Sequence, residues 1–317
     1  MKPNAPSPWR LIAVFALMLV LLELSLGAFV WLRGQIPGAT SPVLAFGLQA
    51  LFWFATVLLF TAPLLLVERL APGSGLPPHY GRALTYWAAY VPVALLSSQV
   101  VEVLVRWLDI PPLLRLSLDQ LAQHGVPRTL AHIGLLVLSM LLFDFFFYWF
   151  HRMQHGVPLL WRLHQVHHSI RAVNALACYH HPLEDLLRIP FLLVPLALAF
   201  RIDVPQMLLL SAFFSAWAYI NHLDSALNFG PLRVVLVDNH YHRLHHSLRP
   251  EHFGTNFASY FSLWDKLLAP ACCRKATPLA TKWACKTCPR PPTCANCGPF
   301  RSARRRGPEA GFRVPGR

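Results

Sequence analysis

The stretch DFFFYWFHRMQHGVPLLWRLHQVHHS, from Asp144 to Ser169, decides how this chain folds and what it can bind. It joins an apolar, aromatic run to five histidines, and a second histidine-rich stretch, NHYHRLHHS, follows at Asn239–Ser247. Thirteen of the sixteen histidines lie between His151 and His252, which is far more than an even distribution over 317 residues would place in a third of the chain. Such clustering indicates a shared binding function.

The spacing of these histidines is typical of metal ligands on helices. An H-x3-H pair stands at His151 and His155, and H-x2-H-H occurs twice, beginning at His164 and at His242. Residues three or four apart on a helix project from one face, with their Cβ atoms about 5–6 Å apart. Two imidazoles in that relation can chelate one ion. One zinc ion takes three or four protein ligands, so eight or more histidines suit two metal ions.

The composition is that of a membrane protein, with 55% apolar and 13% charged residues. A spanning helix needs about 20 apolar residues, and four runs have that length: Leu11–Leu32, Leu44–Val67, Ala83–Val105 and Thr129–Phe150. Glu23 lies near the middle of the first run. An ionisable group inside a span is a candidate functional group; the alternative is a protonated or paired Glu23 that faces the other helices. Glu102 and Arg106, four residues apart, are expected to pair.

Shorter segments connect the spans and the two histidine clusters. Residues 109–128 are expected to form a short amphipathic connection. Phe191–Phe200 and Val204–Ile220 are predicted to form a re-entrant or tightly turned hairpin, because the chain must return for the clusters to meet. The segments that carry the histidines are rich in arginine, so the positive-inside rule places them in the cytosol. We therefore expect a multi-pass protein of the bacterial inner membrane or the endoplasmic reticulum.

Residues 269–317 differ from the rest of the chain. Residues 271–317 hold eleven Lys and Arg against one acid, which accounts for ten of the fourteen net positive charges. A solvated or lipid-binding tail explains such a composition. The tail also contains the pattern Cys285-x2-Cys288-x5-Cys294-x2-Cys297, although zinc ribbons usually separate the two CxxC pairs by more than five residues. We expect an unstructured basic tail at 269–317, preceded by N-terminal spans at 1–129 and a catalytic domain at 130–268.

Several chemistries use clustered histidines. Imidazole suits zinc, copper, iron and nickel alike. The zinc-protease motif HExxH is absent, and no Ser or Cys nucleophile motif accompanies the clusters. Because the clusters directly follow apolar spans, a lipid chain could reach them, and its carbons offer nothing to hydrolyse. Oxygen activation by a pair of irons is therefore favoured over a histidine-rich metal transporter, a b-type haem protein or a zinc-dependent membrane hydrolase.

The order and flanking residues of these motifs resemble the fatty acid hydroxylase/sterol desaturase superfamily of integral-membrane di-iron enzymes. The similar segments run over about residues 130–268 and comprise D-x3-Y-W-x-H-R-x2-H at Asp144–His155, H-Q-V-H-H-S at His164–Ser169, H-P-L-E at His181–Glu184, N-H at Asn221–His222, F-G-P-L-R at Phe229–Arg233, H-R-L-H-H-S at His242–Ser247 and L-W-D-K-L at Leu263–Leu267. After Trp264 and Asp265 the family usually continues with Phe-Gly-Thr-Tyr. Here the tail begins instead, through a frame change or a lineage-specific extension.

The resemblance implies an all-α, multi-pass transmembrane bundle with a cytosol-facing, histidine-rich di-metal cap. It implies two iron ions as Fe²⁺, O2 as co-substrate, and an external electron donor of cytochrome b5, ferredoxin or reductase type. The implied reaction is hydroxylation or desaturation of an unactivated C–H bond in a sterol, a fatty acyl chain or a related lipid. Membrane and lipid are thus the expected partners, and nucleic acid is not.

The resemblance also assigns residues. The implied catalytic metal ligands are His151, His155, His164, His167, His168, His242, His245 and His246, with His222 as an extra ligand and His181 as a ligand or structural residue. His180, His240 and His252 are expected beside the site or on the surface. Asp144 would orient a ligand by accepting an imidazole N–H, or would pair with Arg152 or water. Phe143 and Phe145–Phe147 would line a lipid channel or pack between helices, and Asn256 and Asp265 would be structural.

Overall fold

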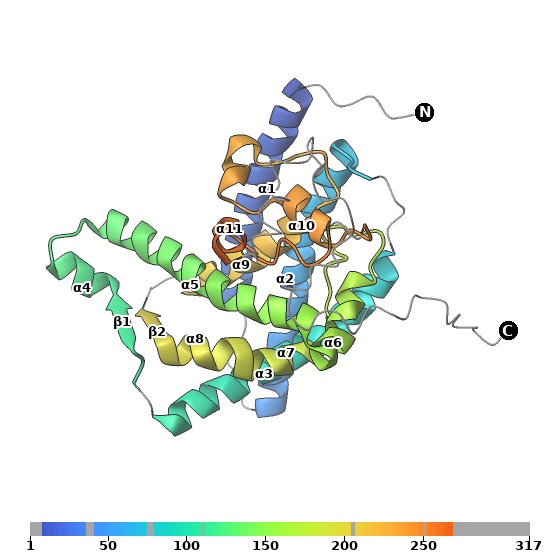
Figure 1. Ribbon diagram of the computed structural model, residues 1–317. Helices are drawn as coiled ribbons and strands as arrows, with labels where there is room; N and C mark the ends of the chain where they lie inside the picture. The colour runs from blue at the N-terminus through green and yellow to red at the C-terminus, as the bar shows by residue number, and fades with distance from the viewer. Residues whose placement is uncertain are drawn as a thin grey trace, which may run out of the picture.

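The computed structural model describes residues 8–35, 41–74, 79–109, 111–203, 207–249 and 252–268. Four long helices account for most of it (Figure 1): α1 (Pro8–Gly34), α2 (Pro42–Leu70), α3 (Tyr80–Leu108) and α5 (Arg128–Gly156). Within these ranges, the same four helices are long and apolar enough to cross a membrane, with mean hydropathies of 1.7 to 2.4. The predicted helical fold and its four spans are therefore confirmed. The cysteine pattern and the basic tail lie outside the described residues.

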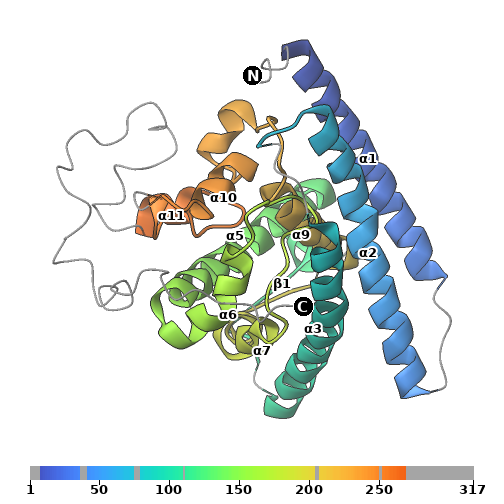
Figure 2. The ribbon, with the colours of Figure 1, turned by 90° about the vertical axis from the view of Figure 1, so that its right-hand side faces the viewer.

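Helices α1 and α2 lie side by side, as both ribbon views show (Figures 1 and 2). Phe29 of α1 is fully buried and packs against the rings of Phe52 and Phe60 of α2, with centroids 5.3 and 6.2 Å apart. Glu23 lies on the exposed face of α1, so the expectation that it faces the other helices is wrong. Glu102 and Arg106 of α3 form the expected ion pair.

The remaining described elements are short. They are β1 (Leu114–Ser117), α4 (Leu118–Gln123), α6 (Pro158–His168), α7 (Glu184–Arg188), η1 (Ile189–Leu193), α8 (Val194–Ala199), β2 (Phe200–Asp203), α9 (Met207–Asn221), η2 (Gly230–Val234), α10 (Asn239–His245) and α11 (Leu263–Leu268). Among them, α6 and α10 carry most of the clustered histidines. The predicted connection at 109–128 thus contains a strand as well as a helix. That strand, β1, pairs in parallel with β2, with Leu114 opposite Phe200.

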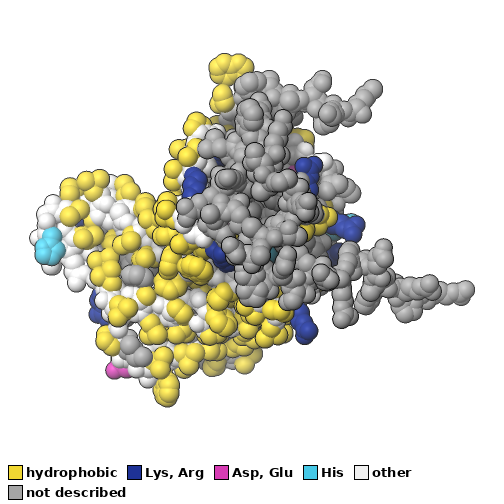
Figure 3. All heavy atoms as spheres, in the orientation of Figure 1, with side chains coloured by type: hydrophobic (Ala, Val, Ile, Leu, Met, Phe, Trp, Pro, Cys, Tyr) yellow, Lys and Arg dark blue, Asp and Glu magenta, His cyan; other side chains and the backbone are white. Residues whose placement is uncertain are grey.

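The hairpin expected between the clusters is present. The run Phe191–Phe200 continues a helical segment, α7–η1–α8, that ends in β2, and α9 brings the chain back toward α10, which it contacts. The return is what allows histidines from both clusters to meet. Apolar side chains cover much of the left and lower part of the surface seen in Figure 3, with few Lys and Arg side chains among them. Large exposed residues such as Trp107 and Leu113, 79% and 90% exposed, suit contact with lipid.

Candidate metal centre

Nine histidines converge in two adjoining groups. In the first, which we call the five-imidazole group, one ring nitrogen from each residue lies within 4.8 Å of the others: His151, His155, His164, His168 and His245. The second, the four-imidazole group, meets the same criterion with His167, His222, His242 and His246. The structure therefore brings together all eight ligands implied by the sequence motifs, together with the extra ligand His222.

The helices explain how one short sequence motif serves both groups. In α6, His168 belongs to the five-imidazole group and its neighbour His167 to the four-imidazole group; His245 and His246 at the end of α10 are divided in the same way. Successive residues on an α-helix point about 100° apart, so an H-H pair cannot serve one ion from one face. The groups touch where the rings of His168 and His246 stack, with centroids 4.4 Å apart.

The ring nitrogens of the five-imidazole group point their lone pairs inward. The Nδ1 atoms of His151 and His245 lie 2.8 Å from the carbonyls of Phe257 and Thr255. A carbonyl only accepts, so these Nδ1 atoms carry the proton and donate it, which leaves Nε2 bare in the neutral ring. All five Nε2 atoms of the group are buried without a hydrogen-bond partner. Buried polar atoms are rarely left unpaired, and a metal ion would satisfy all five.

The four-imidazole group gives a second, independent indication. His167 and His222 donate from Nδ1 to the carbonyls of Tyr179 and Ala218, at 3.0 and 2.7 Å, so their Nε2 atoms are also bare. Those two Nε2 atoms lie only 3.1 Å apart. Two bare nitrogens cannot hydrogen-bond to each other, and their lone pairs repel. A cation between them removes the repulsion, so this donor set fits a metal ion as well.

Burial keeps these imidazoles in the neutral form that metal binding requires. It lowers the pKa of His245 to about 3 and the pKa of His222 to about 4, far below the usual 6.5. The pKa values of His167, His168 and His242 also lie well below that value, first because the rings are buried and then because neighbouring imidazoles would repel an added charge. The pKa of His246 is lowered for the same two reasons. These six imidazoles are therefore neutral at pH 7, the form that can bind a metal ion.

Two buried carboxylates hold the loop that orients the five-imidazole group. Asp144 accepts the backbone N–H groups of residues 259–261, with distances of 2.7, 3.2 and 2.7 Å. Asp265 accepts the N–H groups of Phe257 and Ala258 at 2.9 Å and the Tyr241 hydroxyl at 2.8 Å. Both expectations for Asp144, an imidazole partner or an Arg152 pair, are wrong, since it acts through the backbone instead. Asp265 has the structural role expected of it.

The loop also depends on Asn256. This residue has a positive φ of 61°, a left-handed conformation that Asn adopts more readily than most residues. Its side-chain amide donates to the Tyr241 carbonyl at 2.9 Å, which ties the loop to α10. The conformation turns the carbonyls of Thr255 and Phe257 toward His245 and His151. The structural role expected for Asn256 is thus present in the fold.

The histidines expected beside the site lie in different places. His181 belongs to neither group, and its Nδ1 accepts the Leu183 N–H at 3.2 Å, which agrees with the structural alternative. His180 stacks on the ring of His167, with centroids 3.9 Å apart, and forms a third, mixed group with His164 and Glu184. His240 and His252 are partly buried and belong to none of the three groups.

Sequence reasoning missed the role of Glu184. Its carboxylate Oε2 lies 3.3 Å from the Nδ1 atom of His164, a ligand of the five-imidazole group, and the residue is 1% exposed. The sequence contained a usable signal, since Glu184 ends the H-P-L-E motif and opens α7. A carboxylate that close to a histidine motif is a candidate for orienting a ligand.

The aromatic run before His151 packs mainly between helices. Phe143 stacks on Phe214 of α9 with ring centroids 5.2 Å apart, and Phe145 packs against Trp264 of α11 at 5.1 Å. Phe147 contacts the ring of His151 at 5.3 Å. The packing alternative therefore describes Phe143 and Phe145, whereas Phe147 adjoins the metal ligands.

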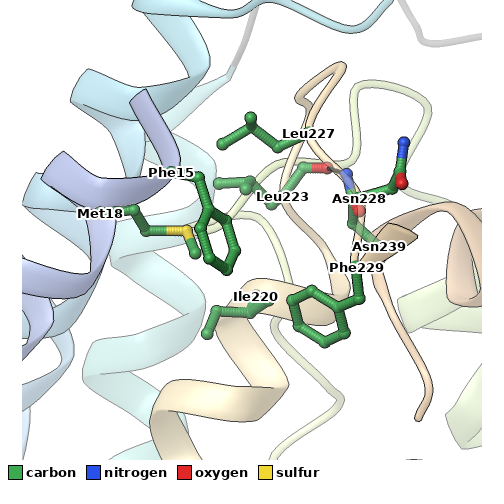
Figure 4. Close-up of a pocket in the computed structure, with 8 residues that line it drawn as sticks. All are labelled: Phe15, Met18, Ile220, Leu223, Leu227, Asn228, Phe229 and Asn239. Atoms are coloured by element: carbon green, nitrogen blue, oxygen red, sulfur yellow. Dashed lines mark hydrogen bonds between the residues drawn. The ribbon is translucent and has the colours of Figure 1, made fainter. Parts of the chain in front are cut away.

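A small apolar cavity lies between α1 and α9 (Figure 4). It encloses about 210 Å³ of empty space including its mouth. Phe15 and Met18 of α1 lie opposite Ile220 and Phe229, and Asn239, the first residue of α10, lines it as well. The metal ligands contribute nothing to its lining, so the cavity adjoins the elements that carry the site without opening into it.

Apolar helices long enough to span a membrane, with two buried groups of bare imidazole nitrogens at one end, define the class: an integral membrane protein with a histidine-rich site that fits two metal ions. Residues 136–269 match the model of the fatty acid hydroxylase family. This part of the chain is therefore similar to fatty acid hydroxylase domains, which confirms the resemblance drawn from the histidine motifs.

Curated relatives extend this result. The chain is 31% identical to human alkylglycerol monooxygenase over 125 residues, which are 39% of this chain and 27% of that protein. It is 29% identical to human cholesterol 25-hydroxylase over 185 residues, 52% of this chain and 58% of that protein. It is also 29% identical to ornithine lipid hydroxylase OlsE of Rhizobium tropici over 133 residues, 42% of this chain and 40% of that protein. No solved structure matches the chain.

Proposed function

We propose that this protein is a membrane-bound lipid hydroxylase whose site holds two metal ions, one in each imidazole group. The observation that carries the proposal is the convergence of nine buried imidazoles in two adjoining groups, with bare nitrogens that nothing else satisfies. The names of the relatives support the reaction class, because they describe a monooxygenase and hydroxylases of lipids. An alkylglycerol, a sterol or an ornithine lipid is the corresponding range of substrates.

We propose iron as the metal. Insertion of oxygen into a C–H bond needs a redox-active ion, which zinc is not, and imidazole is a good ligand for iron. Two iron ions, when bound, would supply O2 activation and oxidation of the lipid C–H bond. The electrons would come from an outside donor, for which a cytochrome b5, a ferredoxin or a flavin reductase is suitable. The arginine-rich segments around the site support a cytosolic orientation.

The residues of the chain have three tasks in this reaction. The neutral imidazoles bind the ions, and the loop carbonyls of Thr255 and Phe257 fix the orientation of two of them. The ring of Phe257 packs against His155 at 5.3 Å and the ring of Trp161 against the same histidine at 5.1 Å, so aromatic carbon keeps water from this side of the five-imidazole group. A dry, preorganised site favours oxidation of an apolar substrate over release of reactive oxygen.

The experiment compares purified full-length protein and a His245→Ala variant. Wild type is expected to bind two iron ions per chain and to consume O2 in a reductant-dependent way in the presence of membrane lipid. Mass spectrometry of lipids from cells with each form should reveal a species 16 mass units heavier than its precursor that the variant does not produce. Bound haem, a single zinc ion per chain, or metal transport without lipid oxidation would contradict the proposal.

A further inference from the structure

One histidine of the five-imidazole group, His164, has a carboxylate beside its Nδ1 atom. Four of the nine imidazoles donate from Nδ1 to a backbone carbonyl: His151, His167, His222 and His245. His164 is the one among the nine whose Nδ1 faces a carboxylate in a described hydrogen bond, that of Glu184 at 3.3 Å. A carboxylate accepts a stronger hydrogen bond than a neutral carbonyl. It thereby increases the electron density on the opposite ring nitrogen, which in His164 is the Nε2 atom that faces the ion.

The Glu184 carboxylate is committed to that contact. It is almost fully buried, and its Oε1 atom has no hydrogen-bond partner. A buried carboxylate is costly unless it is paired. The guanidinium of Arg188 lies 3.5 Å from Oε1 and supplies the compensating charge. Glu184 and Arg188 therefore form a buried ion pair, and Glu184 accepts a hydrogen bond from the imidazole of His164.

Helix α3 fixes this ion pair in place. Arg188 also contacts Asp185 at 3.1 Å and the Tyr90 hydroxyl of α3 at 3.2 Å. The same hydroxyl donates to Asp185 at 2.8 Å, which closes a ring of three side chains. The position of Glu184 is thus set by a spanning helix and not by the ligand that it contacts. A preorganised acceptor of this kind fixes the orientation of an imidazole ring.

His164, His180 and Glu184 have ligand atoms close enough to suggest a third metal site. The guanidinium of Arg188 argues against that assignment. It already neutralises the carboxylate, and a divalent cation beside a buried, permanently charged guanidinium would be strongly repelled. The Nδ1 atom of His164 would also have to lose its proton. Glu184 therefore acts on the five-imidazole group through His164.

We propose that Glu184 is a positioning residue that orients His164 and strengthens its bond to the ion of the five-imidazole group. The inference rests on the proposed two-metal centre and concerns how the two ions differ. It predicts that the ion of the five-imidazole group depends on a carboxylate and that the ion of the four-imidazole group does not. Loss of an acceptor behind a metal-bound histidine typically lowers metal affinity 10–100-fold.

The test is a Co²⁺ titration of metal-free, full-length Glu184→Gln protein in detergent, followed by visible absorption. Glutamine keeps the size of the side chain and removes its charge. One Co²⁺ ion is expected to bind about 10–100-fold more weakly than in wild type, with a shifted absorption band, while the other binds normally. Glu184→Asp keeps the charge on a shorter side chain, so its Co²⁺ affinity should lie between those of wild type and Glu184→Gln. Thermal unfolding of the metal-free proteins checks that each variant folds, and Glu184→Asp carries the test if Glu184→Gln does not.

Asp224→Asn is the matched control. Asp224 is also buried and also paired with an arginine, Arg243 at 2.8 Å, but it contacts no ligand of the five-imidazole group. Its substitution should leave the affinity and the absorption band of that ion unchanged. Wild-type affinities and spectra in Glu184→Gln, or an equal loss in Asp224→Asn, would overturn the proposal. Fewer than two ions bound by wild type would instead overturn the two-metal centre itself.

Discussion

The two imidazole groups use the same side chain and differ in what holds it. In the five-imidazole group, His151 and His245 bond to carbonyls of the loop at 255–261, and His164 bonds to Glu184. That loop is clamped by Asp144 and Asp265. In the four-imidazole group, His222 bonds to the carbonyl of Ala218, one turn back in its own helix, and His167 bonds to Tyr179. Among the described contacts, a carboxylate bonds directly to an imidazole of the five-imidazole group and to none of the four-imidazole group.

We infer from this difference that the five-imidazole group can lose one histidine and still bind its ion, whereas loss of a supporting carboxylate weakens that binding. The half with four ligands should have the opposite behaviour. Substitution of a supporting carboxylate should weaken binding of the ion in the five-imidazole group more than binding of the other ion. Substitution of a histidine should cost more in the four-imidazole group. Acid should weaken the binding of both ions.

Acid is expected to have the largest effect, because it removes both ions. In the unfolded chain each imidazole titrates near 6.5, whereas burial lowers the pKa of His245 to about 3 and that of His222 to about 4. Between these values the unfolded state binds more protons than the folded state, so the free energy of unfolding decreases as the pH falls. The full contribution is present above pH 6.5. Thermal unfolding of the metal-free protein and metal content, both measured from pH 7.5 to 4, should decrease together; stability that rises on acidification would contradict the neutral, buried site.

Removal of one ligand from the four-imidazole group should cost one ion. His222→Ala leaves three imidazoles there and all five in the other group, so bound metal is expected to fall from two ions per chain to one. The loss in affinity should exceed the 10–100-fold that removal of a mere hydrogen-bond partner costs. His155→Ala leaves four imidazoles in the larger group and should retain two ions.

The matched control for both is His181→Ala, because His181 lies outside the two groups. It should bind two ions with unchanged affinity, as measured by elemental analysis after dialysis. Equal losses in His181→Ala and His222→Ala would contradict the assignment of ligands.

Asp144→Asn should have the smallest effect and should weaken only the five-imidazole group. The amide leaves at least one of the three loop N–H groups without its charged acceptor, which costs about 1–3 kcal/mol of folding free energy. The carbonyls of Thr255 and Phe257 would then hold His245 and His151 less firmly. Urea denaturation of the metal-free protein measures the first effect and Co²⁺ titration the second. Equal weakening of both ions would show that the loop does not support one group alone.

The sequence predicted the features that side-chain pattern alone determines. Apolar length identified the four long helices that could span a membrane, and the spacing of His164, His167 and His168 identified histidines on a helix that meet in the two groups. Motif resemblance added His222, which follows α9 and has no partner histidine nearby in sequence. These features are legible because each depends on a few residues close together in the chain.

The features that escaped prediction depend on the backbone or on distant contacts. Asp144 lies two helical turns before His151 on the same face of α5. It nevertheless accepts backbone N–H groups from residues more than a hundred positions later in the chain. Backbone acceptors such as the Phe257 carbonyl are present at every residue, so no side chain marks them. The pairing of β1 with β2 escaped prediction for the same reason, because residues 114–117 pair through their backbones with residues 200–203, which are distant in the chain.

The division of each H-H pair between the two groups has a mechanical consequence. His167 and His168 are joined by one peptide unit, as are His245 and His246, so two short covalent bridges set how far apart the ions can sit. A shift or tilt of helix α6 would therefore move His167 and His168 together, and with them both proposed ion sites. If two ions bind as proposed, the geometry of α6 and α10 would set their separation, and that separation would change only if one of these helices unwound.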